Sequence, residues 1–321
     1  MSPRSRGLLS FLLLVFAITW FIEIGLLRGM RYGSVPYQIS LVGVMFIPAI
    51  CALIVRRFIE REGFGDAGLR WGRGRYYLWA WLAPVGLGLV AAALSLLLRQ
   101  AEFDPYMTEL MVRIHRQSPN LKIPPIHLLR LYIILGSLTQ SVAMNTIFCF
   151  GEEFGWRGYL LMRLTPLGLW PAMIVSGAIW GLWHAPIILQ GHNYPDHPQL
   201  GVLLMTSFCI LLSIIFSWLR LASGSVFTAA LAHASINGPA FTALIFMRDR
   251  NDITTALTGV IGQAVMVIFT IALWRFGAFQ DILYRGHESR AHGSSDIPVA
   301  TGRDRDKNVP PTDRQGEPEP G

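Results

Sequence analysis

Charged residues are scarce in this sequence. Only 15% of its 321 residues are Asp, Glu, Lys or Arg, whereas 52% are hydrophobic, and the mean hydropathy is +0.43. A soluble globular domain typically carries about a quarter charged residues. This composition therefore excludes an ordinary soluble protein. Repeated apolar runs of about twenty residues indicate a polytopic helical membrane protein instead.

Cysteine is also scarce. Cys51, Cys149 and Cys209 lie within or beside apolar stretches and show neither CxxC nor CxH spacing. They are typical of small core residues and do not indicate a disulfide framework or a cysteine-based metal site. The HExxH motif of zinc proteases is absent. The sequence shows no internal repeat and no second folded domain.

Eight apolar stretches predict membrane spans. They cover residues 8–27, 38–55, 76–98, 128–150, 168–190, 199–219, 225–247 and 256–276. We expect an all-α bundle of about eight transmembrane helices that forms one domain over residues 1–276. The first stretch is too long for a signal peptide and is expected to stay uncleaved. Glu23, near its end, is expected to reach the membrane interface rather than to catalyse. Residues 277–321 are rich in Gly, Pro, Asp and Arg, which predicts a disordered polar cytoplasmic tail.

The net charge of +7 needs no nucleic-acid partner, because basic residues in the loops of a membrane protein usually report its topology. Most of the 27 Lys and Arg residues fall inside if the amino terminus is cytoplasmic, owing to the arginine-rich loop at 56–75 and the tail. This bias predicts a multi-pass protein of the cell membrane with both termini in the cytoplasm and residues 191–198 outside.

Residues 151–158, GEEFGWRG, place two adjacent carboxylates at the end of a long apolar segment. Ionisable groups at membrane depth are costly and usually mark a functional site. Glu153 and Arg157 are four residues apart, so on a helix they share one face and predict a salt bridge. Glu152 points away from Arg157, and Asn145 lies on its face and could hydrogen-bond to it. The alternative is an ordinary charged cluster where a helix meets the cytoplasm.

Two other apolar stretches also carry polar residues. His184 follows Trp180 by one helical turn, whereas His233 and Asn237 are four residues apart and share one face. A single histidine in a span is often only a hydrogen-bonded core residue. Together with Glu152, on three separate helices, these residues could form a polar pocket in which one carboxylate acts as a general base.

Three short motifs, in this order and spacing, resemble those of the CPBP family, which comprises CAAX-protease and bacteriocin-processing membrane proteins and is also called Abi or Rce1-like. The motifs are Glu152-Glu153-x-x-x-Arg157, Trp180-x-x-x-His184 and His233-x-x-x-Asn237. The similarity covers residues 140–245. In one departure, Trp180 stands where the second motif usually has Phe, which we expect to alter the shape of the pocket more than its chemistry.

The resemblance implies an intramembrane endopeptidase that hydrolyses a peptide bond of a membrane-associated or prenylated protein. Glu152 and His184 would activate a water molecule. His233 and Asn237 would polarise the scissile carbonyl, while Glu153 and Arg157 would orient the site. The implied partners are a protein or peptide substrate and the lipid bilayer, without nucleic acid.

The sequence does not decide whether the site uses a metal cofactor. Glu152, His184 and His233 could bind zinc with an open coordination position, as in a metalloprotease. The same residues are equally compatible with a mechanism that uses no metal.

Three other functions compete with this interpretation. A serine intramembrane protease would need GxSG, and the sequence offers only LASG, with Ser223 as the serine. A proton-coupled transporter could use Glu152 and the histidines as a relay, although no inverted repeat is visible. A non-enzymatic scaffold or bacteriocin-immunity protein would keep these residues for structure and tolerate Glu152→Gln.

Overall fold

The structure is a computed structural model and describes residues 2–31, 33–280 and 282. The tail predicted at 277–321 lies almost entirely outside these residues. Its predicted disorder therefore stays a prediction.

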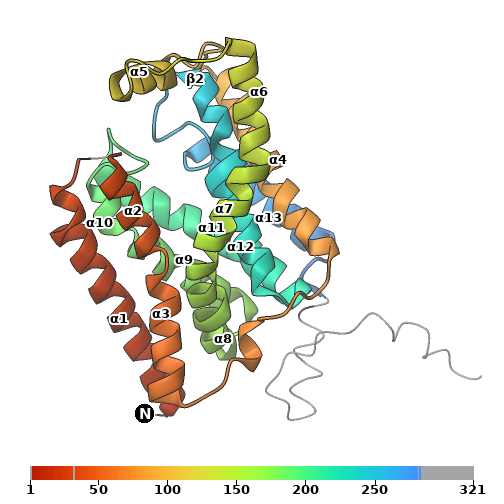
Figure 1. Cartoon of the computed structure of the whole chain (residues 1–321). Helices are drawn as coiled ribbons and strands as arrows, with labels where there is room; N and C mark the ends of the chain where they lie inside the picture. Colours follow the sequence, from red (N-terminus) through yellow and green to blue (C-terminus); the bar gives the residue numbers. More distant parts are fainter. Residues whose placement is uncertain (1, 32, 281, 283–321) are drawn as a thin grey trace, which may run out of the picture.

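The described chain is a bundle of helices (Figure 1). The α-helices are α1 (Pro3–Gly25), α2 (Val35–Val44), α3 (Ile47–Ile54), α4 (Arg75–Leu97), α5 (Thr108–Gln117), α6 (Ile126–Gly136), α7 (Val142–Glu153), α8 (Leu161–Leu164), α9 (Leu169–Trp183), α10 (Ala185–Leu189), α11 (Pro198–Ser223), α12 (Val226–Ser235) and α13 (Val260–Arg275). Among the described residues, the only strands are β1 (Glu102–Phe103) and β2 (Met247–Arg248), which pair antiparallel.

Short helices of other types complete the chain. The π-helical segments are η2 (Val55–Glu60), η4 (Ser137–Ser141), η5 (Phe154–Leu160) and η7 (Ile236–Ala240). The 3-10 segments are η1 (Leu27–Gly29), η3 (Gly65–Ala67), η6 (Thr165–Leu167) and η8 (Ala243–Phe246). Two of the π-helical segments, η5 and η7, contain residues of the first and third motifs, and π turns occur frequently at functional sites.

The predicted all-α membrane bundle is confirmed, but two of the eight spans are shorter than expected. Within the described part of the chain, six helices are long and apolar enough to cross a membrane. They are Pro3–Gly29, Val35–Glu60, Arg75–Leu97, Ile126–Leu167, Pro198–Ser223 and Val226–Phe246. The spans predicted at 168–190 and 256–276 correspond to shorter apolar helices, α9 and α13.

The span predicted at 168–190 is not one continuous helix. α9 ends at Trp183, and α10 begins at Ala185 with Pro186 in its first turn. Proline lacks a backbone N–H and clashes with the preceding turn, so the helix is interrupted there. His184 lies at this interruption, between the two helices.

Glycine allows the helices that carry the motifs to approach their neighbours closely. A Cβ atom added to Gly151 would lie 2.7 Å from the carbonyl oxygen of Met45, between α7 and the turn before α3. One added to Gly177 of α9 would lie 2.5 Å from Cα of Ile210 in α11. Small residues are the usual means of close helix packing in membranes. They hold α7 and α9 in place, and α7 also packs against α12 (Figure 1).

The loops fall into two groups at opposite ends of the bundle (Figure 1). At the end that holds the amino terminus, Arg4 donates to Glu62 at 2.8 Å, and Arg163 donates to Asp66 at 2.9 Å. At the other end, Arg250 pairs with Glu109. These contacts agree with the predicted division of the loops between two sides. Which end faces the cytoplasm stays a prediction.

Reporter fusions test that orientation. A reporter placed after Gly191 is expected outside and one placed after Gly321 inside, because the basic residues of the loop at 56–75 favour the cytoplasm. A fusion after Gly63 is the control and should report the same side as the one after Gly321. If the fusions after Gly191 and Gly321 report the same side, the predicted topology is wrong.

Candidate active site

The three motifs meet at Trp180 of α9. Its indole Nε1–H donates a 2.8 Å hydrogen bond to Oε2 of Glu152 on α7. Its ring centroid lies 5.2 Å from that of His233 and 5.8 Å from that of His184. All four side chains line one cavity of about 400 Å³, which Asn237 also lines. The residues predicted to form a polar pocket are therefore brought together.

The predicted salt bridge between Glu153 and Arg157 is present. Arg157 Nη1 donates to Glu153 Oε1 at 3.0 Å, and both side chains are fully buried. The same carboxylate oxygen lies 2.9 Å from His233 Nδ1, which joins α7 to α12. Arg157 Cζ also lies 4.4 Å from the ring centroid of Trp180, a cation–π contact. These contacts fix Trp180 and His233 relative to each other.

His184 has a defined orientation at the end of α9. Its Nδ1 lies 2.9 Å from the backbone oxygen of Trp180. A carbonyl oxygen only accepts, so Nδ1 carries the proton, and in the neutral ring Nε2 carries the lone pair. The ring of Trp183 lies edge-on with its centroid 4.8 Å away. His184 is therefore positioned to accept a hydrogen bond through Nε2.

Asn237 and Asn145 have partners that the sequence did not indicate. Asn237 Nδ2 lies 3.6 Å from Sγ of Cys149, and a thiol is a weak acceptor. Asn145 Nδ2 donates to Oγ of Ser141 at 3.1 Å. Asn145 therefore hydrogen-bonds to Ser141, one turn earlier in the chain, rather than to Glu152 as the sequence had suggested.

Trp180 contributes to the chemistry of the site as well as to its shape. The sequence alone led us to expect an effect mainly on the shape of the pocket. Phe at this position would keep an aromatic ring but would have no N–H to offer Glu152. The 2.8 Å bond from the indole occupies one of the two carboxylate oxygens. The presence of Trp180 where the second motif usually has Phe therefore changes the hydrogen bonding of Glu152, the candidate base, as well as the shape of the pocket.

The expectation that Glu23 reaches the interface is wrong. Glu23 is only 1% exposed and lines the same cavity as Glu152. Three hydrogen bonds hold its helix against the second motif. They run from Trp20 Nε1 to Trp183 O at 3.2 Å, from Trp183 Nε1 to Thr19 Oγ1 at 2.8 Å, and from Gln190 Nε2 to Glu23 O at 3.1 Å. The rule that intramembrane acids face the interior would have found Glu23.

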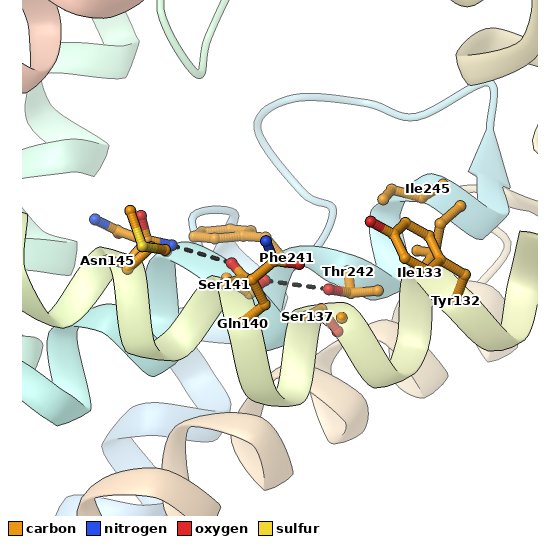
Figure 2. A pocket seen from close by; sticks show the side chains of 13 residues that line it. Tyr132, Ile133, Ser137, Gln140, Ser141, Asn145, Phe241, Thr242 and Ile245 are labelled. Carbon is orange, nitrogen blue, oxygen red and sulfur yellow. Dashed lines mark hydrogen bonds between the residues drawn. The ribbon is translucent and has the colours of Figure 1, made fainter.

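A second, more open hollow of about 600 Å³ adjoins the cavity (Figure 2). We call it the lateral groove. The residues that line it are Tyr132, Ile133, Gly136, Ser137, Gln140, Ser141, Met144, Asn145, Asn237, Gly238, Phe241, Thr242 and Ile245. Its walls are α6, η4 and α7 on one side and η7 and η8 on the other. Asn145, Asn237 and Phe241 line both hollows, so the groove leads to the catalytic candidates.

The suggested zinc ligands do not fit a metal site as they stand. Within the described part of the chain, no group of three or more His, Cys, Asp or Glu side chains is arranged to hold a metal ion. Glu152, His184 and His233 line one cavity without forming such a group. We therefore derive no catalytic step through a metal.

Ser223, the serine considered for a serine protease, has a structural environment. It is fully buried, accepts a 3.0 Å hydrogen bond from Ser225 N and lies 2.8 Å from Thr228 Oγ1. These contacts shape the turn between α11 and α12. Neither Ser223 nor any other serine is among the described residues that line the cavity.

The fold and the site define a polytopic helical membrane protein with a buried cavity of carboxylate and histidine side chains. Residues 134–238 match the model of a family described as type II CAAX prenyl endopeptidase Rce1-like. This range contains all three motifs, and the resemblance noted in the sequence is confirmed for it.

A curated relative gives a short additional match. "CAAX prenyl protease 2" of Methanococcus maripaludis is 43% identical over 44 residues. The aligned stretch covers 13% of this chain and 16% of that protein. Both matches are thus to proteins described as CAAX prenyl endopeptidases or proteases.

Proposed function

We propose that the protein is an intramembrane endopeptidase that hydrolyses a peptide bond of a membrane-associated or prenylated protein or peptide. The observation that most supports the proposal is the arrangement around Trp180, where Glu152, His184 and His233 face one cavity within a membrane bundle. A helical bundle does not need two histidines and two adjacent acids in its core for packing. Ionisable groups at this depth usually serve a function.

In the proposed mechanism, Glu152 is the general base. Trp180 binds its Oε2, which leaves Oε1 for a water molecule whose second contact is Nε2 of His184. Glu152 removes a proton from this water as its oxygen attacks the scissile carbonyl carbon. The same proton then goes to the leaving nitrogen when the C–N bond breaks.

His233 and Asn237 are assigned to the carbonyl oxygen. Glu153 holds His233 through Nδ1, so the opposite nitrogen, Nε2, is the one available to the substrate. When the ring carries both protons, Nε2–H donates to the developing oxyanion. Among the described residues, the amide of Asn237 is paired with the thiol of Cys149, a weak acceptor, so it can donate to the same oxygen at little cost.

The lateral groove offers a route for the substrate. No residue of α6 or η4 is buried, so this wall makes few contacts with the rest of the bundle. The groove combines apolar side chains such as Ile133, Phe241 and Ile245 with polar ones such as Gln140 and Ser141 (Figure 2). An extended peptide needs partners for its backbone groups within a membrane. A lipid-linked peptide therefore suits this surface.

A peptide assay tests the proposal. Purified protein in lipid nanodiscs is incubated in ¹⁸O-labelled water with a mixture of prenylated and unmodified peptides. We expect new carboxyl termini that carry ¹⁸O, detected by mass spectrometry, and far fewer of them from Glu152→Gln. A proton-coupled transporter would move substrate without cleaving it. A scaffold would keep its wild-type function in the variant Glu152→Gln. Either result would contradict the proposal.

Trp180→Phe should slow hydrolysis while leaving the protein folded. The variant keeps an aromatic ring but loses the hydrogen bond to Glu152, and a bond to a charged group contributes about 1.5–3 kcal/mol. We expect kcat/KM to fall roughly tenfold to a hundredfold. Trp81→Phe is the matched control, because it removes an indole bond to the backbone oxygen of Leu138, and neither residue lines the cavity. An unchanged rate in Trp180→Phe would show that this bond does not support catalysis.

Hydrolysis is expected to withstand metal chelation. The described residues provide no ready set of three metal ligands, so treatment with a membrane-permeant chelator, followed by dialysis, should leave the rate within about twofold of its initial value. Metal analysis of the same samples serves as the control. A loss of activity that added zinc restores would contradict the metal-free mechanism.

A further inference from the structure

The catalytic cavity holds two carboxyl groups from different helices. Glu152 comes from α7 and Glu23 from α1, close enough for electrostatic repulsion between them. None of the described residues that line the cavity is Lys or Arg. Arg157 is fully buried and donates to Glu153 instead. Among the described residues, the cavity wall therefore holds two carboxyl groups with no Lys or Arg beside them, and His233 is its cationic group when that ring carries both protons.

Glu23 is only partly satisfied within the protein. The backbone N–H of Ile187 donates to its carboxyl group. Its Oε2 is buried and has no hydrogen-bond partner among the described residues. Leaving such an atom unpaired in a low-dielectric site is costly, by roughly 1–3 kcal/mol or more for a charged group. Because Glu23 also lines the cavity, its unpaired oxygen is a candidate partner for a hydrogen-bond donor that binds there.

The position of Glu23 is fixed rather than adaptable. The hydrogen bonds of Trp20, Trp183 and Gln190 described above join α1 to α9 and α10 on both sides of His184. Glu23 therefore keeps its place relative to the candidate catalytic residues. Because it lies outside the family match at 134–238, that match does not assign it a role.

We propose that Glu23 binds an ammonium group at the active site, and in particular the amino terminus that hydrolysis creates. This inference rests on the proposed function. In peptide hydrolysis the water oxygen bonds to the carbonyl carbon and the C–N bond breaks. The nitrogen takes up protons and leaves as R–NH₃⁺, while the other product is a carboxylate. A carboxylate that receives this ammonium forms a charge-assisted hydrogen bond, which is stronger than a neutral one.

A lysine side chain of the substrate would offer the same chemistry from another source. Both groups are primary ammonium ions, and both match an unpaired carboxyl oxygen. The two sources differ in one respect that can be measured: acetylation of the peptide amino terminus abolishes the first and leaves the second intact.

The test measures binding and needs no turnover. Four peptide probes are titrated at pH 7 against the full chain in nanodiscs by isothermal calorimetry. The first pair is trileucine amide and its N-acetyl form. The second pair is an N-acetyl tripeptide amide with a central lysine and its norleucine counterpart. Mass spectrometry after each titration confirms that the probes are intact. Each titration is repeated with Glu23→Gln, which keeps an acceptor for Ile187, and with Glu102→Gln, an exposed acid paired with Arg248.

We expect free trileucine amide to bind about tenfold more tightly than its acetyl form. This preference should vanish in Glu23→Gln and persist in Glu102→Gln. A Glu23-dependent preference for lysine over norleucine instead would also support the ammonium site and assign it to a substrate side chain. If neither pair shows a preference, or if a preference survives in Glu23→Gln, the inference is wrong.

These outcomes are independent of the proposed protease activity. Glu23-dependent binding without any peptide cleavage would leave the ammonium site standing and refute the protease. Cleavage without Glu23-dependent binding would support the protease and refute the ammonium site.

Discussion

Glu152→Gln is expected to give a folded protein that hydrolyses peptides about a hundredfold to ten-thousandfold more slowly than the wild type. The amide has nearly the shape of the carboxylate, and its oxygen can still accept the hydrogen bond from Trp180 Nε1. Packing around the cavity should therefore survive. The amide cannot take a proton from water, so the general base is lost.

The neighbouring acid provides the contrast. Glu153→Gln leaves the fully buried Arg157 without a carboxylate, so we expect it to reduce the amount of folded protein as well as activity. Both variants are compared by kcat/KM and by thermal unfolding in the same detergent. Substantial activity in Glu152→Gln would exclude it as the base. Equal loss of folded protein in both variants would refute the division of roles between the two acids.

Helical periodicity was enough to predict the ion pair within the first motif. Glu153 and Arg157, four residues apart, form the expected ion pair at 3.0 Å. The convergence of Glu152, His184 and His233 on one cavity was also anticipated. Such inferences succeed because spacing along a helix fixes which residues share a face. The cost of burying a charge then indicates that this face points inward.

Contacts between distant parts of the chain were not predictable in this way. Glu23 reaches the cavity because hydrogen bonds tie α1 to α9 and α10, and no local pattern encodes that pairing. The bond from Trp180 to Glu152 likewise depends on how α9 packs against α7. The interruption at His184 had a visible cause in Pro186. Its effect, two short helices in place of one span, depends on the bundle that surrounds them.

The π-helical conformation at the ends of the first and third motifs also could not be predicted from the sequence. α7 gives way to the π-helical η5 immediately after Glu153, and Asn237 lies in the π-helical η7. A strict α-helical projection therefore places Asn237 only approximately relative to His233. Wider turns of this kind are short insertions in regular helices, and tertiary packing decides where they are tolerated.

The substitution with the largest expected effect on stability is Arg157→Leu. The guanidinium is fully buried, donates to Glu153 and lies over the rings of Trp180 and Phe216. Removing it leaves the buried Glu153 carboxylate without its guanidinium partner and with only the contact to His233 among the described residues, and breaking a buried ion pair costs about 3–5 kcal/mol. We expect little folded protein by size-exclusion chromatography and a clearly lower unfolding temperature.

The double variant Glu153→Leu/Arg157→Leu separates this charge effect from lost packing. Because replacing both members of a buried pair by apolar residues is often nearly neutral, the double variant should recover most of the folded protein. It should not recover hydrolysis, since His233 loses the carboxylate that holds its Nδ1. If Arg157→Leu alone folds as well as the wild type, the ion pair does not stabilise the bundle. If the double variant folds and retains full activity, Glu153 does not position His233 for catalysis.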